Sequence, residues 1–243
     1  MNESLSFMCD KASFAVASIK DDTHSFIAYY DDTMLEAAIK YKTIVDEFDD
    51  AIKAGEFKMY LQPQISAKTR RLTGAEALVR RIKPDGTIIS PIDFIPVYEK
   101  SGLISRLDRY IWEQAAAKLG EWKKAGINMS ISVNISPKDF YYIDIFNTFA
   151  GLIKKYDIEP SNLKIEITET TIMSDVPNLM GELEELRKAG FTLEMDDFGS
   201  GYSSLNTLKD INVDVLKVDM GFIKETKNVK KSRIILASVI KMA

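Results

Sequence analysis

The sequence predicts an α/β fold in which short parallel strands alternate with helices. Four segments show the alternation of apolar and polar residues, with a period of two, that is typical of strands: residues 130–135, 163–168, 191–196 and 214–219. The stretches between them are long enough to hold a helix, as a crossover between parallel strands requires. This arrangement predicts either a doubly wound sheet or a (β/α) barrel.

The first 33 residues differ from the rest of the chain. A short helix is expected at 10–20 and a strand at 25–30. Because one helix and one strand cannot enclose a core, this part is interpreted as a fragment or an appendage. A helix is expected from about 34 to 53, and Gly55 is well placed as its C-cap.

From Phe57 onwards the predicted units become regular. In chain order we expect strands at 58–65 and 72–79, a helical pair across 91–124, strand 130–135, helix 144–155, strand 163–168, helix 176–188, strand 191–196, helix 202–209, strand 214–219 and a final helix at 232–242. A closed barrel of this type has eight strands, and only about six are recognisable here. We therefore expect a barrel that lacks about its last two strands.

Composition narrows the classes of protein that the chain can represent. A net charge of −4 and a pI of about 5.3 argue against a surface for duplex nucleic acid or for an anionic membrane. The single cysteine, Cys9, excludes an intramolecular disulfide and fits a reducing compartment. No apolar run approaches the ~18 residues of a membrane span, and no signal-peptide pattern is present. A cytoplasmic protein, or the cytoplasmic side of a larger signalling protein, is expected.

Charged and amide side chains interrupt the strands on one face. Asn134, Glu166, Asp196 and Lys217 lie near the C-terminal ends of their strands. Parallel sheets are usually covered by apolar residues on both faces, and burying charged groups without partners costs much free energy. These four side chains are therefore expected to face one another around a metal ion.

The chemistry of the acidic side chains favours a hard divalent cation. Glu76 and Asp197 extend the oxygen-rich set at the strand ends, and such ligands suit Mg²⁺ or Mn²⁺. The adjacent pair Asp196 and Asp197 could serve two ions about 3.5–4 Å apart, the arrangement that clamps a phosphoryl displacement. Zinc is not expected, because His24 is the only histidine and no cysteine cluster exists.

Three further signals leave alternatives open. Lys217 could orient or deprotonate a metal-bound water or stabilise phosphate charge, but it could equally form a plain salt bridge with Glu194 or Asp219. Arg80 could reach a phosphate or be a solvated arginine, and its neighbour Arg81 is interpreted as a charge without special purpose. Gln62, next to a proline, is either a substrate contact or a hydrogen-bonding residue at the strand end.

The turn that begins at Asp196 contains the tripeptide Asp-Phe-Gly, which also occurs in protein kinases. No kinase catalytic loop, glycine-rich nucleotide loop or Val-Ala-Ile-Lys strand lies upstream, so the kinase interpretation is excluded. The glycines and hydroxyls of residues 199–204 instead suit an anion-binding turn before a helix.

Taken together, these motifs resemble the EAL domain family from about residue 51 to the end. The resemblance is carried by EALVR at 76–80, PIDFIP at 91–96, SGLI at 101–104, SVNIS at 132–136, EITE at 166–169, DDFGSG at 196–201 and LKVD at 216–219. The family comprises bacterial phosphodiesterases that hydrolyse cyclic di-GMP to linear pGpG. It implies a TIM-like (β/α)8 barrel whose first strand runs antiparallel.

The resemblance also implies a role for each motif residue. Glu76, Asn134, Glu166, Asp196 and Asp197 would be metal ligands for a two-metal site of Mg²⁺ or Mn²⁺. Lys217 would contact the catalytic water, with Glu76 and Asp196 as its catalytic partners. Gln62 and Arg80 would hold the substrate, and Glu169 would brace the loop after Asp197. A homodimer formed through the EAL domain is a further possibility.

The resemblance also divides the chain into regions. Residues 1–33 look like the end of a GGDEF domain without its signature, 34–53 like a connecting helix, and 54–243 like a C-terminally truncated EAL domain. The later Glu-Gly-Val-Glu and Gln-Gly motifs of the family are missing, so the isolated chain is expected to have little hydrolase activity. Two alternatives stay open: a non-catalytic sensor or interaction module that binds cyclic di-GMP, and, more remotely, an unrelated metal-dependent barrel enzyme such as an enolase-like one.

Overall fold

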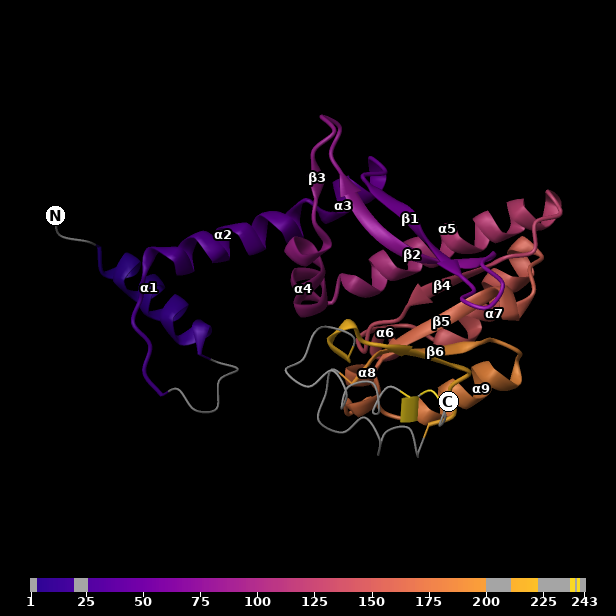
Figure 1. The fold of residues 1–243 in the computed structure, drawn as a ribbon. Helices are drawn as coiled ribbons and strands as arrows, with labels where there is room; N and C mark the ends of the chain where they lie inside the picture. Colours follow the sequence, from indigo (N-terminus) through magenta and orange to yellow (C-terminus); the bar gives the residue numbers. More distant parts are fainter. Residues whose placement is uncertain (1–3, 20–25, 200–210, 223–236, 239, 241–243) are drawn as a thin grey trace.

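The computed structural model describes residues 4–19, 26–199, 211–222, 237–238 and 240. Three helices come first, α1 (Leu5–Ser18), α2 (Asp32–Asp46) and α3 (Phe48–Lys53), followed by strands and helices in alternation (Figure 1). The later elements are β1 (Phe57–Ile65), β2 (Leu72–Ile82), β3 (Ile88–Ile89), α4 (Pro91–Ser101), α5 (Ile104–Lys124), β4 (Ser130–Asn134), α6 (Asp139–Tyr142), α7 (Ile145–Tyr156), β5 (Leu163–Thr168), α8 (Glu169–Met173), α9 (Leu179–Lys188), β6 (Leu193–Phe198) and β7 (Val215–Val218). Short 3₁₀ turns lie at Pro160–Asn162 and Met220–Phe222.

A single sheet organises the molecule. Its strand order is β1-β2-β4-β5-β6-β7, with the short β3 paired to β2. β1 runs antiparallel to β2, whereas β2, β4, β5, β6 and β7 pair in parallel. The predicted barrel-type α/β fold with an antiparallel first strand is therefore confirmed. Among the described strands, β1 and β7 are the ends of the path and do not pair with each other.

Helices α5, α7 and α9 cover the outer face of the parallel strands (Figure 1). Trp112 from α5 packs on Phe149 from α7 with ring centroids 4.8 Å apart, and Phe149 in turn meets Phe191 before β6. Below these rings lie fully buried strand residues such as Ile131 and Ile165. Each such side chain contributes about 1.5–3 kcal/mol when it leaves water, so this layer holds the strand ends in place.

Several predicted elements are corrected by the structure. No strand forms at the described residues 26–30: Phe26, Ile27 and Tyr29 are exposed, and the segment lacks a neighbour to complete a ladder. The helix expected at 34–53 begins at Asp32 and is divided at Glu47 into α2 and α3. The other predicted elements are present, with boundaries that differ by a few residues, except that the helices expected at 202–209 and 232–242 lie outside the described residues.

At this division Glu47 contacts Arg81, a residue that the sequence did not reveal as special. Arg81 is only 2% exposed, and its guanidinium contacts Glu47 at 2.7 Å and Glu56 at 2.9 Å. It also lies over the ring of Phe57. The interpretation of Arg81 as a tolerated charge was therefore wrong: it joins the N-terminal helices to β2, the strand that carries Glu76.

No helix in the described parts of the chain is both long enough and apolar enough to cross a membrane.

Candidate active site

The strand register brings the polar positions of neighbouring strands into rows. Glu76 on β2 pairs with Ser132 on β4, Asn134 pairs with Glu166 on β5, and Thr168 pairs with Asp196 on β6. Because side chains alternate between the faces of a strand, residues two apart along each strand share the inner face. The acidic positions therefore converge on the inner face of the sheet.

Lys217 on β7 stands among three of these carboxyl groups. Its ammonium lies 2.9 Å from Glu76 Oε2 and 3.5 Å from Asp196 Oδ2, and it donates a short hydrogen bond to Glu166 Oε1. Of the alternatives left open for Lys217, the pair with Glu194 does not form: Glu194 contacts Lys164 at 2.8 Å and accepts a hydrogen bond from Ser132 at 2.7 Å. Lys164, Glu194 and Ser132 thus form a separate set of polar contacts.

The electrostatics of this cluster are set by burial and by close charges. Burial, the neighbouring carboxyl group of Asp196 and the charge of Glu76 raise the pKa of Glu166 to about 8, although Lys217 opposes them. Burial works to lower the pKa of Lys217, but its bonds to Glu166 and Glu76 outweigh this and raise it. Near neutral pH the cluster therefore contains a cationic lysine and a proton on or near Glu166.

The second aspartate of the pair takes an unusual backbone conformation. Asp197 has φ of 54°, a left-handed value that non-glycine residues rarely adopt, and the pairing of β6 with β7 shifts register between Met195 and Phe198. This bulge leaves Asp197 exposed, whereas Asp196 points to Lys217. Burial and the charge of Asp196 raise the pKa of Asp197.

The loop after Asp197 is tied to α8. Glu169, the first residue of α8, accepts a hydrogen bond from the amide of Gly199 at 3.2 Å. Residues 200–204, whose hydroxyls and glycine formed part of the expected anion-binding turn, lie outside the described residues.

The carboxylate and amide oxygens of the site suit a divalent cation, although three of the carboxyl groups contact Lys217 in this structure. Among the described residues, no three acidic, histidine or cysteine side chains are arranged to hold a metal ion. However, Glu166 Oε2 is buried without a hydrogen-bond partner, and a cation that displaces the proton of this carboxyl group would give the oxygen a partner. Glu76, Asn134, Glu166 and Asp196 are the residues that would supply ligands.

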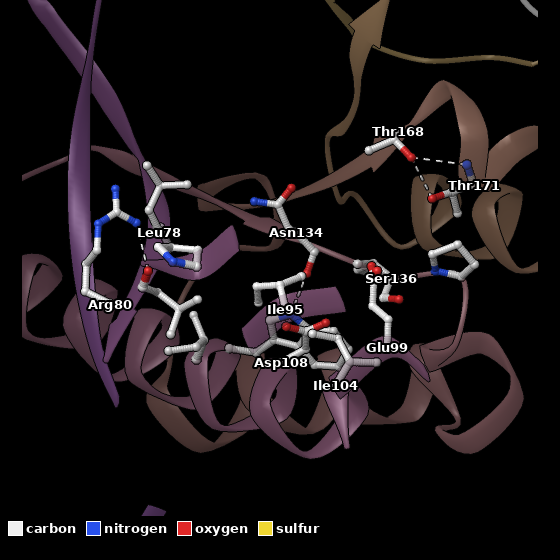
Figure 2. A pocket seen from close by; sticks show the side chains of 17 residues that line it. Leu78, Arg80, Ile95, Glu99, Ile104, Asp108, Asn134, Ser136, Thr168 and Thr171 are labelled. Carbon is white, nitrogen blue, oxygen red and sulfur yellow. Dashed lines mark hydrogen bonds between the residues drawn. The ribbon is translucent and has the colours of Figure 1, made fainter. Parts of the chain in front are cut away.

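A cavity of about 280 Å³ opens beside this cluster, bounded by β2, α4, α5, β4 and the start of α8. Figure 2 shows Arg80 and Thr168 on opposite sides of the cavity with Asn134 between them. Much of the remaining wall is apolar and includes Leu78 and Ile95. Such a space, with few polar groups among apolar walls, is typical of small-molecule sites.

Two carboxyl groups that the sequence analysis missed line the floor of this cavity. Glu99 comes from α4 and Asp108 from α5, and burial raises the pKa of each. The signal for Asp108 was present in the sequence: it shares a helix face with Ile104, Ile111 and Trp112, where an apolar residue is expected.

The predicted site residues differ in whether they line the cavity. Arg80 lines the cavity, and its guanidinium donates to the carbonyl of Val79 at 2.7 Å. Gln62 on β1 pairs with Glu76 in the strand register, but its side chain is exposed and does not line the cavity. Asn134 joins the two regions, since it lines the cavity and its backbone carbonyl accepts a hydrogen bond from Trp112 at 2.9 Å.

An α/β sheet of this topology, with acidic residues and a lysine gathered inside its parallel strands, defines a TIM-barrel-like protein. Residues 45–243 match the EAL domain family. The chain belongs to that family.

Relatives agree with this assignment. The chain is 32% identical over 232 residues to the signaling protein YkoW of Bacillus subtilis, which covers 96% of this chain and 29% of that protein. It is 30% identical to the cyclic di-GMP phosphodiesterase PA2567 of Pseudomonas aeruginosa, over 89% of this chain and 37% of the relative. The chain thus spans about a third of the length of these curated relatives.

Solved structures share the fold. The PaMucR phosphodiesterase in complex with c-di-GMP superposes with a TM-score of 0.74 and 30% identity, over 82% of this chain and 81% of that one. The EAL domain of FimX from Xanthomonas citri in complex with c-diGMP gives a TM-score of 0.76 over 86% of this chain. At 21% identity, this second likeness concerns the fold alone.

Proposed function

We propose that the protein containing this chain hydrolyses cyclic di-GMP to linear pGpG with the help of Mg²⁺ or Mn²⁺. The observation that carries the proposal is the meeting of Glu76, Glu166, Asp196 and Lys217 next to a cavity that contains Arg80. One relative is named as a cyclic di-GMP phosphodiesterase, and a similar phosphodiesterase is solved in complex with c-di-GMP.

In this reaction a water oxygen forms a bond to phosphorus, and the bond from phosphorus to one ribose 3′ oxygen breaks. A divalent cation held by Glu76, Asn134, Glu166 and Asp196 would supply electrostatic stabilisation and lower the pKa of the attacking water. The freed 3′ oxygen gains a proton and the water loses one, so the products are one linear dinucleotide with a 5′ phosphate and a 3′ hydroxyl.

The residues of the chain have separate tasks in this proposal. Lys217, held as a cation by its carboxyl neighbours, would hydrogen-bond the attacking water and balance charge that builds on the phosphate. A carboxylate of the cluster accepts the water proton. Arg80 can pair with a phosphate through two parallel hydrogen bonds, and the adjoining cavity can hold one base between its apolar walls.

A second candidate is a sensor that binds the nucleotide without cleaving it. It is favoured by one observation: Lys217 fills the space between the carboxyl groups, where the described residues do not form a three-ligand metal site.

Two measurements on the complete protein decide between these functions. Chromatography after incubation with cyclic di-GMP and Mg²⁺ or Mn²⁺ should reveal pGpG, whereas calorimetry in the presence of EDTA measures binding alone. Product formation that is lost in Glu76→Gln supports the hydrolase. Binding without turnover under every metal condition supports the sensor. Absence of both nucleotide binding and product formation contradicts both functions.

A further inference from the structure

Glu194, a buried carboxyl group that the proposed reaction does not use, lies beside Glu166 on the inner face of the sheet. Glu194 on β6 is the register partner of Glu166 on β5. Because register partners on neighbouring strands present their side chains to the same face, both carboxyl groups share the interior. Glu194 is only 1% exposed. Two negative charges in this arrangement repel each other, and a buried anion needs a partner of opposite charge.

Both oxygens of Glu194 are held by residues further from the C-terminal ends of the strands. Lys164 Nζ lies 2.8 Å from Oε1, and Ser132 Oγ donates a hydrogen bond to Oε2 at 2.7 Å. Lys164 comes two residues before Glu166 on β5. Ser132 comes two residues before Asn134 on β4, so both partners lie one step towards the N-terminal ends on the same face. The carboxyl group of Glu194 is therefore directed away from Glu166.

These polar contacts cross the interior of the curled sheet. Ser132 on β4 and Glu194 on β6 come from strands that are separated by β5, and Lys164 on β5 completes the set. Gln64 on β1 extends it, since its side-chain amide donates to Ser132 Oγ at 3.5 Å. Side chains from β1, β4 and β5 thus fix the position of the Glu194 carboxyl group.

Two lysines of the inner face contact different carboxyl groups. Lys217 contacts the cluster that includes Glu166, whereas Lys164 contacts Glu194. Without Lys164, Glu194 would be a buried anion whose described partner is a hydroxyl group, and such a loss of an ionic partner costs much free energy. A cation bound to Glu166 would be within reach of Glu194, because the two glutamates are register partners.

We propose that Lys164 is a positioning residue for the divalent cation: it binds Glu194 and so keeps this carboxyl group out of the ligand set around Glu166. This inference rests on the proposed function, since it assumes that a divalent cation binds at Glu166. Removal of Lys164 should turn Glu194 into an additional anionic ligand. A further carboxylate increases metal affinity, but it also neutralises positive charge that the attacking water and the phosphate require.

The first test measures metal binding by the complete protein without nucleotide. Calorimetry with Mn²⁺ should give a Kd about 10-fold lower for Lys164→Met than for the unaltered protein. The double variant Lys164→Met/Glu194→Gln should return the Kd to near its original value, because it no longer carries the freed carboxylate. A pair that served stability alone would loosen the site when broken, so unchanged or weaker Mn²⁺ binding in Lys164→Met overturns the inference.

The second test identifies a change in the ligands of the metal. The electron paramagnetic resonance spectrum of bound Mn²⁺ depends on its ligands, so it should change in Lys164→Met and return in the double variant with Glu194→Gln. An identical spectrum in Lys164→Met and in the unaltered protein contradicts entry of Glu194 into the ligand set.

The third test follows hydrolysis of cyclic di-GMP at saturating Mn²⁺. Lys164→Met should lower kcat by at least about 10-fold with little change in KM, although it binds Mn²⁺ more tightly. The double variant with Glu194→Gln should recover kcat to within about 3-fold of the unaltered protein. Equal losses of kcat in Lys164→Met, Glu194→Gln and the double variant would show that the pair acts on stability alone.

Further variants cover the case in which Lys164→Met does not fold. Lys164→Gln keeps a hydrogen-bond donor for Glu194 but lacks the charge, so we expect the same direction of change in Kd and kcat. Glu194→Gln alone should leave the Mn²⁺ spectrum unaltered, and a changed spectrum would make Glu194 itself a ligand and overturn the inference. Lys155→Met is the matched control, because it breaks an exposed ion pair with Glu113 on the outer helices and should change neither Kd nor kcat.

The outcomes separate this inference from the proposed function. Unaltered Mn²⁺ binding and unaltered kcat in Lys164→Met overturn the inference and leave the proposed function standing. Lack of pGpG formation by the unaltered protein overturns the proposed function, while the Mn²⁺ titrations and spectra still decide whether Lys164 excludes Glu194 from the metal. If the unaltered protein binds no Mn²⁺ and no Mg²⁺, both are overturned.

Discussion

Lys217 Nζ lies 2.9 Å from Glu76 Oε2, although the two residues come from β7 and β2, which are separated by three strands in the sheet. A flat sheet would hold these strands about 19 Å apart at the usual spacing. The contact therefore requires the sheet to curl strongly, so that its inner face becomes the interior of a barrel. The ion pair spans this interior.

Replacing Lys217 by Met should abolish most of the proposed hydrolysis while the fold remains. The carboxyl groups of Glu76, Glu166 and Asp196 would lose their common cation, and the attacking water would lose its hydrogen-bond donor. We expect kcat to fall by at least about 10²-fold. Chromatographic measurement of pGpG checks this, with circular dichroism as a control for folding; kcat within a few fold of the parent contradicts a role for Lys217 in the reaction.

Metal affinity should rise with pH. Because the pKa of Glu166 is raised to about 8 in the metal-free protein, a cation must displace a proton from the cluster at neutral pH. The apparent Kd for Mn²⁺ should therefore fall as the pH increases from about 6 to about 8 and level off above this value. Calorimetry in two buffers of different ionisation enthalpy measures the released proton, and a Kd that does not depend on pH contradicts this assignment.

Glu166 should also make the metal-free protein less stable in alkaline solution. Its folded pKa is above the unfolded value of 4.5, so the folded state holds the extra proton between these two values. The stability from the protonated form is complete below the lower value and is lost as the pH rises through about 8.

Glu166→Gln, which stays neutral, should flatten this dependence and exceed the parent in free energy of unfolding at about pH 9, by on the order of 2 kcal/mol. Urea unfolding in EDTA at several pH values measures the difference. If the free energy of unfolding depends on pH in the same way in both proteins, Glu166 is not the cause of the loss of stability in alkaline solution.

Arg81→Met should destabilise the protein much more than removal of a surface cation. The substitution leaves Glu47 and Glu56 without their partner at a buried site, and breaking a buried ion pair costs about 3–5 kcal/mol. We expect the free energy of unfolding to fall by about 3 kcal/mol, at the lower end of this range, because Glu47 is partly exposed. Lys40→Ala, which breaks an exposed pair with Asp93, should cost about 1 kcal/mol or less. Similar losses in urea unfolding for both variants contradict this account.

Trp112→Phe should affect stability and ligand binding together. The indole N–H donates to the carbonyl of Asn134, and the ring packs on Phe149. Loss of the hydrogen bond and of ring volume should lower the free energy of unfolding by on the order of 2 kcal/mol. KM should rise in addition, since Asn134 lies between the cavity and the carboxyl cluster. An unchanged KM at reduced stability limits Trp112 to packing.

Much of the fold could be predicted from the sequence because periodicity and helix-length spacing are local signals. The strands around Asn134, Glu166 and Asp196 form as expected, and so does the parallel order. The strand expected at 25–30 failed because local β propensity does not supply a neighbour to pair with. The contact of Glu47 with Arg81 was not predictable from local signals, because Arg81 lies 34 residues further along the chain.

The carboxyl cluster was predictable for the same reason, because strand phase decides which side chains share the inner face. The cavity was less predictable. Glu99 and Asp108 lie on α4 and α5, and both reach the cavity because these helices pack together. Only the position of Asp108 on an apolar helix face offered a hint, and no pattern within the sequence linked it to Glu99.

The contact between Glu76 and Lys217 joins residues 141 positions apart in the chain. Contacts of such long range form late in folding, because a large loop must close before they add stability. We therefore expect the carboxyl groups of Glu76, Glu166 and Asp196 to lack this cation until β7 docks. A ligand that bridges the two sides would favour this last docking step and should appear as slower unfolding as well as a higher melting temperature.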